Sequence, residues 1–228
     1  MTIGSDSRLS FEEILTGDAD ETDGTVDLLA GFPEVTPRAL AILSLCDTVE
    51  QLDRWEVEPL RLVLAAKSSH LALQAALTDA LAGSDGTGAF DLKLKAEYFA
   101  YFEKSREGDP AAPLSDRVMS FGDLLKRAVE HPMEWSRRTL EVSLEEADLL
   151  NRLTFVRHRV EHVRPGSFFI EPFFIAQTLP VSARLTQELL DVAGHHYEDG
   201  ERDAVCNAVM VINARCSQIH PPFLHPPN

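Results

Sequence analysis

Hydrophobic positions recur along most of the chain at steps of three and four residues, the spacing expected of helices that bury one face. This pattern predicts helices over residues 37–52, 59–82, 92–106, 120–131, 143–164, 180–193 and 201–217. Only the aromatic segment 167–175 lacks a clear period, and it fits a short strand pair or an irregular arm. We therefore expect an all-α bundle of about seven helices.

Residues with strong local preferences mark the expected helix ends. Thr36-Pro37 combines an N-cap with a proline at the first helical position. Ser143, followed three residues later by Glu146, has the spacing of a capping box, and we expect it to start the central helix. Pro165-Gly166 is expected to end that helix, and Pro180 to open the next one.

The two ends of the chain differ from its middle in composition. Residues 1–36 hold nine acidic residues and one arginine, with a single short helical candidate at 11–15. The sequence predicts an acidic, partly ordered arm over 1–36, a helical domain over 37–219 and a proline-rich, extended tail over 220–228.

Composition narrows the function classes. No apolar run approaches the length of a membrane span and no signal pattern opens the chain, so we expect a soluble, cytoplasmic protein with no membrane partner. The three cysteines have no CxxC spacing, which argues against a disulfide framework and a zinc knuckle. A net charge of −16 disfavours wholesale nucleic-acid binding, although six arginines between residues 137 and 164 make that region locally basic.

Most of the candidate chemistry lies on the central helix, between residues 151 and 166. At about 100° per residue, its polar side chains form an arc opposite the Leu/Val stripe. The members of this arc are Asn151, Thr154, Arg157, His158, Glu161 and His162. Arg157 and His162 lie at the two edges of the arc, about 140° apart, so one helix does not aim both at one point.

Two interpretations of this arc follow from its residues alone. His158-x-x-Glu161-His162 matches the HxxEH zinc pattern of a hydrolase, but the sequence offers no evident third ligand. Alternatively the arc is structural, with Arg157 and Glu161 as an i,i+4 ion pair and the histidines hydrogen-bonded at an interface.

A third interpretation rests on resemblance. Arg157-His158-x3-His162 resembles the R-[N/D/H]-x3-H signature of the HEPN (higher eukaryotes and prokaryotes nucleotide-binding) superfamily. The motif follows "LNRLTF" near the end of a late helix, and the earlier "FGDLLKRA" resembles the helix that commonly precedes it. The resemblance covers residues 40–195 and implies a HEPN-like bundle.

The resemblance also implies an activity, a metal-independent endoribonuclease that needs no cofactor and acts at the cleft of a homodimer. Arg157 would hold the phosphate, His162 would move protons, and His158 would orient the phosphate or carry a second proton. Further candidate substrate-binding residues are Asn151, Thr154, Arg159 and Arg164. The resemblance further implies a toxin or phage-defence setting, an RNA substrate and an antitoxin or other protein partner. It also leaves a second possibility open, because many HEPN-like proteins are non-catalytic dimeric interaction modules.

Overall fold

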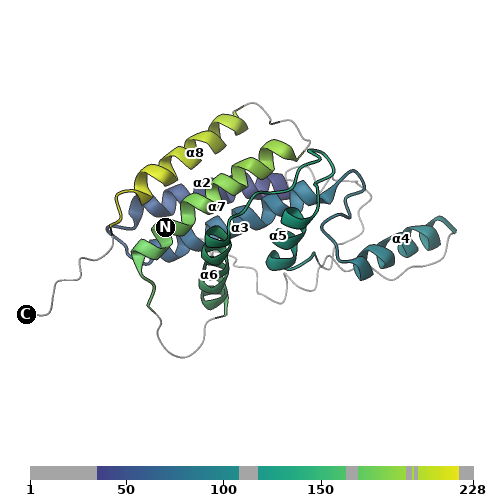
Figure 1. Cartoon of the computed structure of the whole chain (residues 1–228), viewed down its shortest axis with the longest axis horizontal. Coiled ribbons are helices and arrows are strands. Elements are labelled where there is room, and N and C mark those ends of the chain that lie inside the picture. Colours follow the sequence, from purple (N-terminus) through teal and green to yellow (C-terminus); the bar gives the residue numbers. More distant parts are fainter. Residues whose placement is uncertain (1–34, 108–117, 163–168, 194–196, 198–199, 221–228) are drawn as a thin grey trace, which may run out of the picture. The chain divides into compact units, whose positions relative to one another are not determined.

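The computed structural model describes residues 35–107, 118–162, 169–193, 197 and 200–220. Within these residues it contains seven α-helices and no strand, so the predicted all-α class is confirmed (Figure 1). The helices are α2 (Pro37–Arg54), α3 (Arg61–Ala82), α4 (Leu92–Glu107), α5 (Phe121–Glu130), α6 (Leu144–Glu161), α7 (Pro172–Val192) and α8 (Glu201–Cys216).

Four long helices form the centre of the bundle. α2 packs on α3 and α8, and α7 packs on the same two helices from the other side of the core. α6 lies against α3 and α7, and α5 lies against α3 (Figure 1). The largest wholly buried side chains are mostly leucines drawn from all of these helices except α8, and burying them supplies the main driving force for folding.

The helix starts predicted at Thr36-Pro37 and at Ser143 are confirmed. Thr36 Oγ1 accepts a hydrogen bond from the Ala39 N–H at 3.0 Å, with Pro37 in the first turn of α2. Ser143 and Glu146 form both hydrogen bonds of a capping box at the start of α6. These starts were predictable because each depends on two or three residues that are adjacent in the sequence.

The segment after the central helix differs from the prediction. α7 begins at Pro172, so the end of the aromatic segment 167–175 is helical rather than a strand pair or an irregular arm. Pro180 lies inside α7 instead of at its start. Proline removes one backbone hydrogen bond from a helix interior. Ten buried side chains along α7, among them Leu179 and Ala183 beside the proline, offset that loss.

The central helix α6 ends earlier than predicted. Its last residue is Glu161 and His162 is its C-cap, whereas Pro165-Gly166 and the candidate residue Arg164 lie outside the described residues. Its buried face consists of Leu150, Leu153 and Val156. Other predicted segments outside the described residues are positions 1–34 of the acidic arm and 221–228 of the tail. No described helix is long and apolar enough to cross a membrane.

The aromatic residues of α4 lie outside the hydrophobic core. Phe99 and Phe102 are 46% and 45% exposed, and α4 makes no extensive contact with another described helix. Tyr98 instead packs against Phe102, with their ring centroids 4.7 Å apart. The sequence pattern identified an apolar face on α4 but not whether another helix covers it.

One buried charge cluster ties the central helices together. The Arg38 side chain from α2 lies 3.8 Å from Asp79 of α3 and 3.5 Å from Glu201 of α8. Its guanidinium donates to the Leu190 carbonyl of α7 at 3.4 Å and lies 4.4 Å from the centre of the Tyr197 ring. A guanidinium with so little access to water needs these contacts, because an isolated buried charge is very costly.

Candidate functional site

The C-terminal end of α6 is held in place by contacts along the whole helix. Leu150 and Leu153 are wholly buried against the bundle. At the start of the helix Glu146 pairs with Arg184 of α7 at 2.7 Å. The hydrogen bond from the Ser143 N–H, together with Arg184, lowers the pKa of Glu146. These contacts fix the rotation of α6, and with it the direction in which each polar side chain of the motif points.

His158 and His162 lie side by side at the end of α6. Both are exposed, and their ring centroids are 4.4 Å apart with an angle of 62° between the ring planes. The backbone N–H of His162 donates to the backbone carbonyl of His158 at 3.0 Å, which closes the last turn of the helix. The predicted proximity of the two histidines is present, and both rings are open to solvent.

Arg157 forms an ion pair with Glu161 on the same helix. Arg157 Nε lies 2.7 Å from Glu161 Oε2, and the two side chains are 31% and 29% exposed. The pair engages the carboxylate that a zinc hydrolase would need as its base. A guanidinium has five N–H donors in a planar fork, so this pairing leaves donors with which Arg157 can contact a phosphate.

His70 of α3 lies behind the motif helix, and the sequence analysis did not find it. It is 1% exposed, packs on Phe121 with ring centroids 4.4 Å apart, and its Nε2 lies 3.3 Å from Thr154 Oγ1. Thr154 donates its only hydroxyl proton to the Leu150 carbonyl at 2.9 Å. The hydroxyl therefore accepts from His70, so the proton of the neutral imidazole is on Nε2.

Burial, and then the positive charge of Arg157, lower the pKa of His70 from 6.5 to about 4. His70 is thus uncharged at neutral pH and supports α6 through Thr154 rather than by an ion pair. In the sequence, the one sign of a special role for His70 is its polar ring in the alanine- and leucine-rich sequence of α3. Its partners are 51 and 84 positions further along the chain, and sequence spacing cannot identify them.

A further polar contact joins Ser68 of α3 to a carboxylate of α2. Ser68 Oγ donates a short hydrogen bond to Asp47, which comes from α2. Asp47 also accepts a hydrogen bond from Gln51, and no histidine is among the described hydrogen-bond partners of Ser68 and Asp47. The arrangement links α2 to α3 and does not form a hydrolase triad.

The four tentative substrate-binding residues have different surroundings. Asn151 is exposed on α6, whereas Thr154 uses its hydroxyl for the contacts with Leu150 and His70. The Arg159 guanidinium lies 5.9 Å from the centre of the Phe155 ring. Arg164 is outside the described residues. Of the three that are described, Asn151 is exposed, and Thr154 and Arg159 are partly buried.

The zinc interpretation gains no support from the geometry. Among the described residues, no three histidine, cysteine, aspartate or glutamate side chains lie close enough together to hold a metal ion. Glu161 is directed to Arg157 rather than to the two histidines. A catalytic zinc site normally needs three protein ligands, and the described residues provide two at this end of α6.

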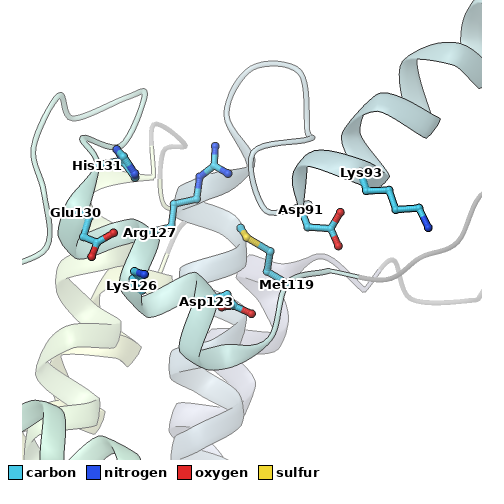
Figure 2. Close-up of a pocket in the computed structure, with 8 residues that line it drawn as sticks. All are labelled: Asp91, Lys93, Met119, Asp123, Lys126, Arg127, Glu130 and His131. Carbon is cyan, nitrogen blue, oxygen red and sulfur yellow. The ribbon is translucent and has the colours of Figure 1, made fainter.

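A separate open hollow of about 740 Å³ lies between α5 and the start of α4 (Figure 2). Its walls carry three acidic side chains, three basic side chains, a histidine and a methionine. They are Asp91, Lys93, Met119, Asp123, Lys126, Arg127, Glu130 and His131. The two signs of charge balance, so the hollow lacks the basic character of a nucleic-acid groove, and no residue of the α6 motif lines it.

The chain has no match among the family models, the curated proteins or the solved structures with which it was compared.

Proposed function

We propose that this protein is a metal-independent endoribonuclease of HEPN type that acts at the cleft of a homodimer. The observation that carries the proposal is that Arg157 and two exposed, adjacent imidazoles lie together in the C-terminal turns of α6. These are the groups required for cleavage of RNA by its own 2′-hydroxyl, a cation to bind the phosphate and imidazoles to transfer protons.

In this reaction the 2′-oxygen attacks the adjacent phosphorus and the bond to the 5′-oxygen breaks. His162 accepts the proton of the 2′-hydroxyl, and a second, protonated imidazole donates a proton to the departing 5′-oxygen. Arg157 stabilises the negative charge that accumulates on the non-bridging oxygens. The products are a 2′,3′-cyclic phosphate and a free 5′-hydroxyl.

A second copy of the chain completes the site in this proposal. Arg157 is partly buried on the side of α6 that faces His70, whereas His158 and His162 are exposed. A single helix therefore presents the cation and the imidazoles in different directions. Two α6 helices facing each other would bring the Arg157 of one copy towards the imidazoles of the other.

A non-catalytic interaction module is the second candidate, and the Arg157–Glu161 pair favours it. Glu161 already neutralises the guanidinium that the phosphate would need. The net charge of −16 also repels a polyanion. If this candidate is correct, the exposed histidines take part in dimerisation or in binding a partner protein.

The test is cleavage of a panel of RNAs in EDTA by the wild type, His162→Ala and Arg157→Ala. Each variant should lose about 10²-fold or more of the activity. Arg152→Ala is the matched control, since Arg152 lies on the same helix and also pairs at 2.8 Å with an acid four positions away, in this case the preceding Asp148. It should retain activity.

Three results would contradict the proposal. These are no cleavage by the wild type across the panel, equal losses in Arg152→Ala and His162→Ala, or products without a cyclic phosphate. If the interaction module is correct, His162→Ala instead weakens dimerisation in analytical ultracentrifugation. Growth arrest on induction, relieved by His162→Ala, would support the toxin setting.

A further inference from the structure

The two histidines at the end of α6 have the spacing of a bidentate ligand. Residues four positions apart lie on the same face of a helix, one turn from each other. The rings of His158 and His162 are in contact, with centroids 4.4 Å apart, and both residues are exposed. No buried contact has to be broken to turn both rings towards one ion.

Imidazole nitrogen is a preferred ligand of copper, nickel and zinc, and it binds at about 2.0–2.1 Å in zinc sites. Two nitrogens on one ion therefore lie within about 4 Å of each other, a separation that two rings already in contact can adopt. Magnesium and calcium prefer oxygen ligands, so they are not expected to bind here.

The neighbouring charges permit a cation. Glu161 pairs with Arg157 at 2.7 Å, so the positive charge of the guanidinium in the same turns of α6 is neutralised. The chain as a whole carries a net charge of −16, which favours the approach of cations. Because the carboxylate of Glu161 is engaged, the described residues supply two ligands, and water would fill the other positions of the ion.

We infer that His158 and His162 together chelate one divalent copper, nickel or zinc ion, and that the bound ion inhibits the activity. Chelation occupies the nitrogen lone pair with which one imidazole would accept a proton, and it displaces the proton that the other imidazole would donate, so it blocks both proton transfers. The inhibition rests on the proposed ribonuclease function, but the chelation does not. The ion is an inhibitor of the site, in contrast to the catalytic zinc of a hydrolase.

Binding is measured on the untagged full chain by titration calorimetry, in a buffer that does not coordinate metals. Copper should bind most tightly, nickel and zinc more weakly, and magnesium not at all. His158→Gln and His162→Gln should each lower the copper affinity at least tenfold, because each leaves a single imidazole. His131→Gln, which removes an exposed histidine of α5's C-cap, is the matched control and should bind as the wild type does.

A spectroscopic signature separates chelation from a loss of folding. The electron paramagnetic resonance spectrum of the copper complex should show coupling to two imidazole nitrogens in the wild type and to one in either variant. Unchanged affinity or an unchanged spectrum in His158→Gln would overturn the chelation. These measurements need no RNA, so they remain valid if the chain proves not to be a ribonuclease.

The proposed inhibition by the bound ion is tested in the RNA cleavage assay. Zinc or copper at a concentration that saturates the site should abolish cleavage by the wild type, and EDTA should restore it. Cleavage that persists at saturation would overturn the inhibition while leaving the chelation established. Cleavage that requires the added metal would contradict the proposed function itself.

Discussion

The uncharged state of His70 predicts how the stability of the fold depends on pH. Burial and Arg157 lower its pKa from 6.5 to about 4 in the folded chain. In the unfolded chain the imidazole takes up a proton as the pH falls below 6.5, whereas in the folded chain it does not. The unfolded state therefore binds more protons in this window, and folding stability decreases as the pH falls from 6.5 to 4.

This lowering of the His70 pKa corresponds to a loss of about 3 kcal/mol in folding stability across the whole window. Between pH 7.5 and pH 5 the loss from His70 alone is about 2 kcal/mol. Native domains are typically stable by about 5–15 kcal/mol, so a change of this size is readily measured.

The perturbation is His70→Gln, because a glutamine amide can still donate to Thr154 but does not titrate. Urea unfolding of the wild type and the variant at pH 7.5 and pH 5 gives the free energy of unfolding in each case. The variant should be less stable at pH 7.5, since it loses the packing on Phe121, but the gap should narrow by about 2 kcal/mol at pH 5. His131→Gln controls for the loss of a histidine from the chain.

Parallel losses of stability in the wild type and His70→Gln would refute the reasoning. Should the variant fail to fold, the titration of His70 in the wild type can be followed directly by NMR. A midpoint near 4 supports a buried neutral imidazole, and a midpoint near 6.5 contradicts it. The same spectra report the tautomer, which should have its proton on Nε2.

Three further substitutions test other parts of the argument. Glu161→Gln frees the Arg157 guanidinium and should raise RNA affinity several-fold in a filter-binding assay. The control Glu188→Gln, which breaks a comparable i,i+4 pair at 3.1 Å on α7, should leave RNA affinity unchanged. A loss of activity in Glu161→Gln would instead favour a catalytic role for this glutamate. Ser143→Ala removes the capping-box hydrogen bond and should lower the free energy of unfolding by about 1 kcal/mol in urea; no change would show that the cap does not stabilise α6. Gly88→Ala places a Cβ 1.7 Å from the Leu81 carbonyl oxygen and should lower stability by about 2 kcal/mol or more in the same experiment; a neutral effect would contradict the close approach.

The helices were predictable wherever their cause is local. The caps at Thr36 and Ser143 depend on neighbours in the sequence, and both were identified correctly. Pro180 has the local preference of a helix start, yet it lies inside α7 because the buried residues on both sides hold the helix together. The exposure of the aromatic side chains of α4 could not be predicted from the sequence either. Their spacing along the helix is the same as that of a face that packs in the core.

In the candidate site, too, contacts between neighbours in the sequence were predictable and contacts between distant residues were not. The helix period placed His158 and His162 on one arc, and their ring contact follows from four-residue spacing. The ion pair between Arg157 and Glu161 was one of the alternatives that the sequence left open, and the structure contains it. The support from His70 was missed because Thr154 and Phe121 approach it only after α3, α5 and α6 have packed.

The buried charge of Arg38 has a consequence for the order in which this chain is made. A ribosome releases α2 early, but Glu201, which neutralises Arg38 together with Asp79, belongs to the last helix described. Until α8 has emerged, seating α2 against α3 and α7 would leave a guanidinium short of one of its two carboxylates. The nascent helices are therefore expected to stay loosely associated and accessible to chaperones, and to lock together only when synthesis passes α8.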